Sequence, residues 1–302
     1  APVCAQEATE LDSLLNLSAF TEESELQKKL NQSTKVASGK ALGTRETPGI
    51  VSVVTSDEIL KSGARDITDI LRLVPGFEIM QDVQFVTGVG FRGSWANEGK
   101  VLFLLDGHQV NDLLYQTVPL INNFPVDAID KIEIIRGPGS AIYGGSAEYA
   151  VINIITKQAS SLNGIGVYGI GGFHQSATGR TNGGFMASQR GEKFSWDLGG
   201  FRSKGIVSDQ PYTDLYGDVP DAVDLAKVTH ANSTNINLGI KAGGLSLRGM
   251  YNGYDTNDPI YRTTYDNFSA DVKYDWKATD KLVITPQFGY YNQIPWSYDS
   301  IA

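Results

Sequence analysis

The segment Asn267–Lys277, with the sequence NFSADVKYDWK, alternates strictly between two kinds of side chain. Successive residues of a β-strand point to opposite faces, so one face carries phenylalanine, alanine, valine, tyrosine and tryptophan, and the other serine, aspartate and lysine. A strand of roughly 9 to 11 residues with this pattern has the length needed to cross a bilayer at a tilt. The segment therefore predicts a strand of an antiparallel transmembrane β-barrel, with lipid on its apolar side.

Six further segments in the same half of the chain repeat the alternation. They are residues Asn163–Phe173, Asn182–Gln189, Lys193–Ser203, Ser233–Ala242, Leu245–Tyr254 and Lys281–Tyr291. Short connections at residues 189–193, 243–244 and 278–280 and long ones at residues 204–232 and 255–266 match the short turns and long loops of such barrels. We therefore assign residues 159–302 to about seven strands of a partial barrel.

A water-soluble antiparallel sandwich also has alternating strands, and it is the alternative to this interpretation. Soluble strands average about 5 to 6 residues, which is shorter than these segments. Aromatic residues near several predicted strand ends also suit the two interfaces of a membrane (Tyr251, Tyr254, Trp276, Tyr290 and Tyr291). Both observations favour the barrel.

Residues 44–158 have a different texture, in which helical and strand patterns are interleaved. Thr55 and Glu58 have the spacing of a capping box, which predicts a helix that ends at Gly63. A second helix is expected from Asp66 to Pro75–Gly76, because Ile67, Ile70, Leu71 and Val74 share one face. Strands are predicted at Ile50–Thr55, Phe77–Met80, Val101–Leu105, Lys131–Ile135 and Val151–Thr156. The pattern predicts a compact α+β domain that ends near Gln158.

The composition excludes several classes of protein. The net charge of -9 and the pI near 4.9 argue against a nucleic-acid partner, which needs a basic face. The single cysteine, Cys4, rules out an intramolecular disulfide and a cysteine-based metal cluster.

Residues 1–43 are polar, and we interpret them as a leader. Val3, Cys4 and Ala5 resemble the end of a secretory signal cleaved near Ala5, although an ordinary N-terminus is an equal alternative.

Several motifs of the sequence contain residue types that occur in binding and catalytic sites. Gly88, Gly90 and Gly93 form a GxGxxG, but no helix is expected after it, which excludes a dinucleotide site. The histidines (His108, His174 and His230) lie far apart in sequence and are expected to form hydrogen bonds or face water. The aspartates of one long loop suit a solvated loop better than a calcium site (Asp209, Asp214, Asp218, Asp221 and Asp224). Asp106–Gly107 is interpreted as a turn. We therefore expect no catalytic residues, no resident metal and no cofactor.

Residues 47–157 carry a series of motifs that resembles one known family. The motifs are TPGIVSVVTSDEI, SGARDITDILRLVPGFEI, VGFRG, VLFLLDGHQVND and FPVDAIDKIEIIRGPGSAIYGGSAEYAVINIITK. In this order they resemble the plug domain of TonB-dependent outer-membrane receptors, in which a plug precedes the barrel. The resemblance closely covers about a third of the chain.

The resemblance implies a function and several partners. It implies active uptake of a scarce, bulky nutrient, such as a siderophore–iron complex, across the bacterial outer membrane. The partners would be the ligand, outer-membrane lipid and the TonB protein. TonB would bind an N-terminal segment on the periplasmic side by strand addition. We place that segment at Glu7, Ala8, Thr9, Glu10 and Leu11.

The resemblance also implies where the ligand and the barrel contact the plug. We expect the apical loops to be residues 81–87, 94–99 and 110–117, with ligand contacts at Gln81, Gln84, Trp95, Asn97, Tyr115 and Gln116. Arg92 and Arg136 are expected to meet acidic groups inside the barrel, with ordinary surface ion pairs as the alternative.

Seven strands cannot close around a plug, because plugged transporters need about 22. We expect either that these residues belong to a longer receptor or that other chains complete the wall. Two other hypotheses for the function remain. The chain could be a surface protein that is anchored by the barrel and independent of TonB, or a plug-like periplasmic binding module.

Overall fold

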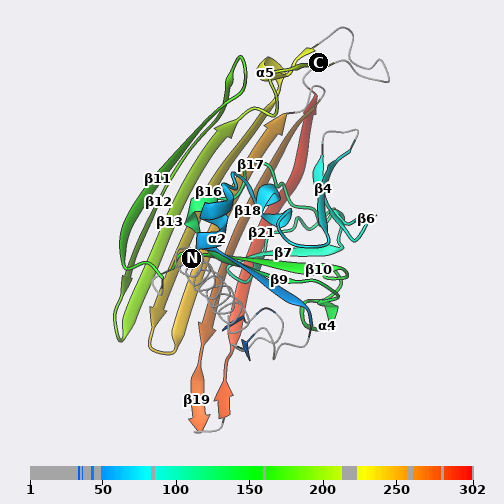
Figure 1. The fold of residues 1–302 in the computed structure, drawn as a ribbon. Helices are drawn as coiled ribbons and strands as arrows, with labels where there is room; N and C mark the ends of the chain where they lie inside the picture. Colours follow the sequence, from blue (N-terminus) through cyan, green and yellow to red (C-terminus); the bar gives the residue numbers. More distant parts are fainter. Residues whose placement is uncertain are drawn as a thin grey trace, which may run out of the picture.

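The computed structural model describes residues 33–34, 36, 42–43, 49–82, 86–158, 161–212, 223–257, 261–279 and 282–300. Two layers make up this part of the chain (Figure 1): a tall curved sheet, called here the wall, and a mixed domain packed against its concave face, called the inner domain (residues 49–158). No helix in the described part is long and apolar enough to cross a membrane.

The wall is a seven-stranded antiparallel sheet in the order β11-β12-β13-β16-β17-β18-β21. Its strands are β11 (Gly164–Phe173), β12 (Thr178–Arg190), β13 (Phe194–Gly205), β16 (His230–Ala242), β17 (Leu245–Asn257), β18 (Tyr261–Tyr274) and β21 (Gln287–Ser300). Each strand pairs with the next wall strand along the chain. The prediction of seven antiparallel strands is confirmed.

Several strand ends differ from the sequence prediction, most of all around β17, β18 and the last two segments. Residues 255–266 were expected to form a long loop, but β17 runs to Asn257 and β18 begins at Tyr261. The sixth segment ends at Tyr274, and Trp276 instead starts β19 (Trp276–Thr279), which pairs with β20 (Leu282–Ile284). The seventh segment is thereby split before Pro286, which cannot donate a ladder hydrogen bond.

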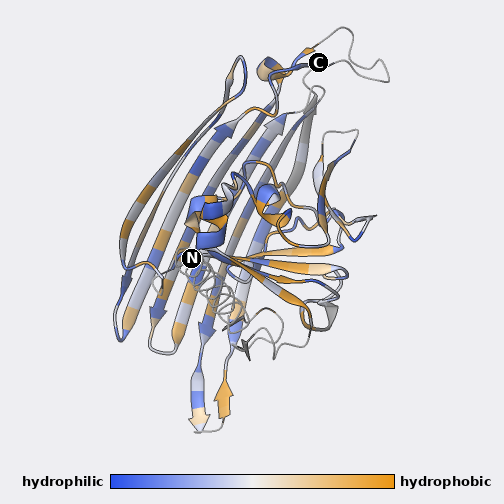
Figure 2. Cartoon of the chain, viewed as in Figure 1, coloured by the Kyte–Doolittle hydropathy of each residue, from blue (hydrophilic) through white to orange (hydrophobic). Residues whose placement is uncertain are grey.

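The two faces of the wall differ as the alternation predicts. Figure 2 shows apolar and polar bands in turn along the wall strands. Large apolar side chains on the face away from the inner domain are 39% to 81% exposed (Ile165, Val167, Phe185, Ile236, Phe268, Val272 and Phe288). Polar side chains at intervening positions are buried against the inner domain (Asn182, Ser203, Ser233, Asn235, Asn252 and Asp271). A soluble sandwich would bury the apolar face instead.

The inner domain is built on a five-stranded sheet in the order β3-β9-β10-β7-β8. Its strands are β3 (Val51–Thr55), β7 (Val101–Leu105), β8 (His108–Gln109), β9 (Ile129–Ile135) and β10 (Ala150–Thr156). A separate sheet contains β4 (Phe77–Gln81), β5 (Thr87–Phe91) and β6 (Ser94–Trp95). The short helices are α2 (Ser56–Ser62), α3 (Ile67–Leu71), η1 (Val126–Ala128) and α4 (Ser140–Tyr143).

The local rules of the sequence hold for the helices, with one difference. Thr55 and Glu58 form the predicted capping box, and Gly63 ends α2 in the left-handed conformation at φ 68°. The second helix is shorter than expected, because α3 ends at Leu71 and the chain turns before Pro75. Its predicted apolar face is nevertheless buried: Ile67, Ile70, Leu71 and Val74 lie in a core to which Met250 of the wall also contributes.

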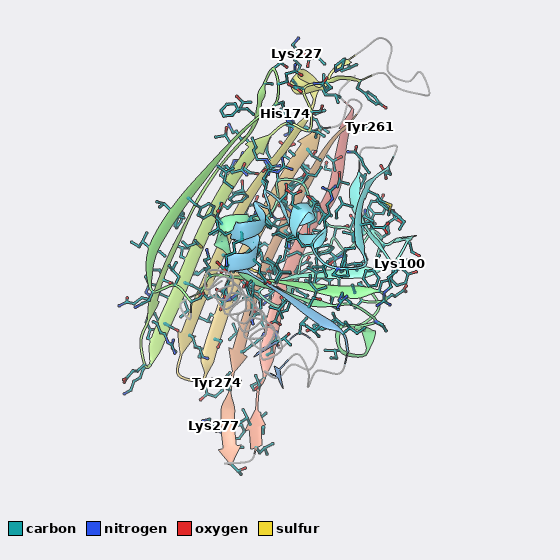
Figure 3. All side chains as sticks on the ribbon, in the orientation of Figure 1. Lys100, His174, Lys227, Tyr261, Tyr274 and Lys277 are labelled. Carbon is teal, nitrogen blue, oxygen red and sulfur yellow. The ribbon has the colours of Figure 1, made fainter. Side chains whose placement is uncertain are left out.

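The remaining elements lie outside these two layers. The connection between β13 and β16 contains β14 (Pro211–Tyr212), β15 (Val223–Asp224) and α5 (Leu225–Val228), and β1 (Ser33–Thr34) pairs with β2 (Leu42–Gly43). In Figure 3, His174, Lys227 and Tyr261 mark one end of the wall, and Tyr274 and Lys277 mark the opposite end. The long connection and the β19–β20 hairpin are therefore at opposite ends of the wall.

Candidate functional site: the loops of the inner domain and their interface with the wall

The loop that follows β6 lies across strand β5, which pairs with β4. Gln81 ends β4 one residue after the pair Met80–Gly88 and lies opposite Thr87. A Cβ built on Gly88 would lie 2.4 Å from Cη2 of Trp95 and 2.7 Å from Cγ of Asn97. The bare backbone of Gly88 therefore lets both side chains lie across β5, and these two of the six predicted ligand residues are neighbours there. Gln81, which pairs with Thr87, lies on the other face of this sheet.

The loop at residues 110–117 is held by one buried carboxylate. Asp112 accepts hydrogen bonds from the backbone nitrogens of Leu114 (2.9 Å), Tyr115 (2.6 Å) and Thr117 (2.6 Å) and from the Thr117 hydroxyl (2.7 Å). The fixed backbone presents Leu113, Leu114 and Tyr115 outward, and each side chain is about half exposed or more. Such a loop has little conformational entropy to lose on binding.

The remaining predicted ligand residues have different surroundings. The backbone nitrogen of Gly99 donates to the Gln116 carbonyl at 3.4 Å, which joins the loops at residues 94–99 and 110–117. The Gln116 side-chain oxygen accepts from Gln109 and Ser146, so this amide is engaged within the domain. Asn97 is buried. Gln84 lies outside the described residues, as do the predicted TonB contacts (Glu7, Ala8, Thr9, Glu10 and Leu11).

Arg92 and Arg136 lie beside each other in the inner domain. A guanidinium nitrogen of Arg92 donates to the Arg136 carbonyl at 3.2 Å, and the same side chain lies 4.9 Å from the centre of the Phe91 ring. Nε of Arg136 is buried and has no hydrogen-bond partner among the described residues. The expected acidic partners from the wall are not among the contacts that the structure describes for either arginine.

Two adjacent asparagines that the sequence analysis did not single out dock the inner domain on the wall. Asn122 donates to the Ala231 carbonyl (3.0 Å) and accepts from the Asn182 amide (2.7 Å). Asn123 accepts from Asn252 through its side chain (2.9 Å) and from Asn235 through its backbone carbonyl (2.7 Å). Both lie within the otherwise apolar stretch VPLINNFP, and a buried amide requires partners.

Asp66 connects α3, this docking segment and the wall. Its carboxylate caps α3 by accepting from Ile67 N (3.0 Å), accepts from Asn122 N (2.8 Å) and lies 3.4 Å from the guanidinium of Arg180 on β12. Burial raises the pKa of the Asp66 carboxyl to about 6, because lost hydration outweighs the hydrogen bond from Asn122 and the attraction of Arg180. The wall contact therefore includes a carboxyl that titrates in the mildly acidic range.

The Asp106–Gly107 turn is confirmed, and its carboxylate has a further role. Both residues have positive φ, 50° and 85°, and they connect β7 to β8. The Asp106 carboxylate is fully buried and accepts from Thr156 N (2.9 Å), from Gln158 Nε2 (2.9 Å) and from Asn237 Nδ2 on β16 (2.5 Å). The turn thus joins the end of β10 to the wall.

Among the residues that the structure describes, no three histidine, cysteine, aspartate or glutamate side chains come together in a group that could hold a metal ion. His108 contacts Asp271, and His230 lies 3.0 Å from Asp255, which agrees with the expectation of hydrogen-bonded histidines. Asp209 accepts from the backbone and hydroxyl of Ser176, and the backbone bond is the main cause that lowers its pKa to about 2. Asp214, Asp218 and Asp221 lie outside the described residues.

The inner domain is similar to a known domain family. Residues 43–151 match the model of the TonB-dependent receptor plug domain. The chain is 36% identical over 120 residues to the vitamin B12 transporter BtuB of Vibrio vulnificus (strain CMCP6), an alignment that covers 37% of the chain and 18% of that protein.

Solved structures extend the similarity to the wall. A mutant of the ferric enterobactin receptor PfeA from Pseudomonas aeruginosa superposes with a TM-score of 0.61 at 19% identity, covering 83% of this chain and 41% of that one. The alcaligin receptor FauA from Bordetella pertussis gives 0.57 at 19% identity, covering 87% and 43%. The chain therefore spans less than half of the length of these proteins, and at this identity the likeness establishes the fold.

Proposed function

We propose that this chain, which has the plug domain and antiparallel wall strands of a TonB-dependent receptor, takes part in active uptake of a scarce, bulky nutrient across the bacterial outer membrane. The observation that carries the proposal is the position of the matched domain. It sits on the polar concave face of a wall whose opposite face is apolar and exposed. That arrangement suits a plug inside a barrel surrounded by lipid.

The proposed ligand is an organic molecule of the kind that the compared receptors take up, such as a siderophore–iron complex. Tyr115 and Trp95 offer aromatic surface, and Gln81 and Gln84 offer amides, so these four are the proposed contacts. Asn97 and Gln116 are also proposed contacts, but their side chains would first have to move. Asn97 is buried, and the Gln116 side chain is hydrogen-bonded within the domain. Stacking and hydrogen bonding together suit a ligand with both apolar and polar parts.

The proposed energy source is TonB, which would bind Glu7–Leu11 on the periplasmic side. The proposed organisation is a leader (residues 1–43), a plug (residues 44–158) and barrel strands (residues 159–302), with the leader and plug reached from the periplasm. Arg92 and Arg136 are proposed to meet acidic groups of the barrel. The buried Nε of Arg136, which has no partner in the described part, supports this assignment.

Uptake by a TonB-deficient host tests the proposal. Cells that express the full-length protein are supplied with ferric enterobactin or cyanocobalamin, the ligands of compared receptors, and cell-associated ligand is measured. We expect accumulation only with TonB present, and we expect deletion of residues 6–43 to abolish accumulation while binding at the cell surface persists. Accumulation of a bound ligand without TonB or without the leader would refute the coupling role.

A matched pair of substitutions tests the ligand site. Tyr115→Ala removes an exposed aromatic side chain from the rigid loop, and the expected loss of ligand affinity is about tenfold. Leu60→Ala removes an exposed apolar side chain from α2 and leaves affinity unchanged. Equal affinities for the two variants would place the ligand elsewhere.

A further inference from the structure

The loop at residues 110–117 carries three consecutive large apolar side chains on its surface. Leu113, Leu114 and Tyr115, called here the apolar platform, are 57%, 59% and 49% exposed. Polar residues, Asp112 and Gln116, flank them in the sequence. Exposed apolar groups with a polar rim are typical of surfaces that bind a ligand or a partner. The loop therefore offers an apolar contact to whatever enters the proposed ligand site.

Three side chains of the wall hold the apolar platform in place. The backbone nitrogen of Leu113 donates to Oε1 of Gln293 at 2.6 Å. Nε2 of Gln293 donates to the hydroxyls of Tyr265 (2.6 Å) and Tyr291 (2.8 Å), and these hydroxyls donate to two backbone carbonyls of the loop at 3.1 Å and 3.4 Å. The wall thus fixes the loop through one amide and two phenols, without using a charged group.

The two loops that meet beside the apolar platform contain acidic residues and neither lysine nor arginine. Residues 94–99 have the sequence SWANEG, and residues 110–117 have the sequence VNDLLYQT. The backbone hydrogen bond from Gly99 to Gln116 joins the two loops. Glu98, whose side chain is exposed, directly precedes that junction. The charge that these loops add to the site is therefore negative.

The lysine and the arginine that flank residues 94–99 in the sequence make their contacts elsewhere. Lys100, labelled in Figure 3, forms an ion pair with Glu148 at 3.1 Å, and its Nζ lies 5.4 Å from the centre of the Tyr149 ring. Arg92, on the turn between β5 and β6, donates to the Arg136 carbonyl at 3.2 Å. Neither contact involves the loop at residues 110–117.

These surroundings disfavour a negatively charged ligand. An anion on the apolar platform would lose hydration without gaining a cation from the two loops, and an unpaired buried charge is costly. The carboxylate of Glu98 would add repulsion between like charges. An uncharged ligand avoids both costs, and its apolar part is stabilised by covering the two leucines and the aromatic ring of Tyr115.

We propose that the ligand is an electroneutral, amphiphilic small molecule whose apolar face covers the apolar platform and whose polar groups bond to the amides and hydroxyls around it. The inference rests on the proposed uptake function and narrows it to one charge class. Neutral hydroxamate chelates of iron and neutral corrinoids belong to this class. A tris-catecholate chelate of iron, which is a polyanion, does not.

Uptake by cells that express the full-length protein and lack other receptors for the probes tests the charge class. Cells with and without TonB are given cyanocobalamin, a neutral ferric trihydroxamate or ferric enterobactin, and cell-associated ligand is measured against concentration. We expect TonB-dependent accumulation of a neutral probe and at least about a hundredfold weaker apparent affinity for ferric enterobactin. TonB-dependent accumulation of ferric enterobactin at equal or higher affinity would overturn the charge class and leave the uptake function standing. If no probe accumulates in a TonB-dependent way, the proposed function fails and the inference fails with it.

Substitutions in the full-length protein test whether the ligand covers the apolar platform. Leu114→Lys should weaken binding of the accumulated neutral probe at least about tenfold, because the ammonium group must lose hydration against an apolar face. Leu114→Met keeps an apolar side chain of similar volume and should lose at most about threefold. Leu60→Lys, at an exposed leucine of α2, is the matched control and should bind like the wild type. Equal affinity of Leu114→Lys and Leu60→Lys would mean that something other than the ligand covers the platform, and the inference would be wrong.

Discussion

Replacing Asp66 by asparagine should change how the stability of the inner domain depends on pH. The wild-type carboxyl is buried and has a pKa of about 6, raised from 3.8 chiefly by lost hydration. A carboxyl with a higher pKa in the folded state binds its proton more tightly there. Its stabilising contribution is therefore fully present below about pH 4 and is lost as the pH rises through about 6.

The size of the effect follows from the shift. A difference of about two pKa units corresponds to about 3 kcal/mol, at 1.36 kcal/mol per unit. Asparagine keeps one acceptor oxygen for the α3 cap but leaves the Asn122 N–H or the Arg180 guanidinium without the second, at a cost of about 1 to 3 kcal/mol that does not depend on pH. Relative to wild type, Asp66→Asn should therefore gain about 3 kcal/mol between pH 4 and pH 8.

Urea unfolding of the inner domain in detergent micelles measures this difference. Trp95 is the only tryptophan in the inner domain, so its fluorescence reports on that domain once the other three are replaced by phenylalanine. Asp57→Asn, at an exposed carboxylate of α2, is the control and should show no such gain. If the difference between Asp66→Asn and wild type stays constant from pH 4 to pH 8, burial is not what governs this carboxyl.

Two glycine substitutions test the close contacts found in the structure. Gly239→Ala places a methyl group against Asp197 and Arg248, which form an ion pair across β16, and should lower the free energy of unfolding by about 1 to 3 kcal/mol. Gly249→Ala, with nothing within 4 Å of the added methyl group, should cost less than about 1 kcal/mol when both variants are compared in thermal melts. Equal costs would mean that the ion pair between Asp197 and Arg248 moves aside freely. Gly88→Ala should displace Trp95, shift its emission and weaken ligand binding, whereas Gly145→Ala, which has open space, should do neither. Unchanged Trp95 emission in Gly88→Ala would contradict the packing described.

Features set by neighbours in the sequence could be predicted. The capping box of α2 joins residues three apart, and the Asp106–Gly107 turn needs two positive φ values that these residue types tolerate. The alternation of Asn267–Lys277 specifies one buried and one exposed face, because a slip of one residue would invert both. Strand β5 was missed, since TGVGF lacks the run of large apolar residues by which the other strands were found.

Strand ends were harder to predict than strands. The alternation stops being readable where a strand leaves the apolar zone, yet pairing continues, as between β17 and β18 up to Asn257 and Arg262. Backbone hydrogen bonds sustain a ladder there without any apolar pattern. Residues 255–266 were therefore predicted as a loop. That prediction used side-chain hydropathy, which carries no information about backbone pairing.

The docking contacts could not be predicted because their partners are remote in sequence. Asn122 and Ala231 are 109 positions apart, and Asp106 and Asn237 are 131 apart. No local rule assigns such pairs, but the need for them is visible: a polar side chain between buried apolar segments has to find partners, since an unpaired one is costly. Asn122, Asn123 and Asp106 all stand at such positions. The Asp106–Gly107 turn explains the backbone at Asp106 but not its buried carboxylate, which is one of the groups that attach the inner domain to the wall.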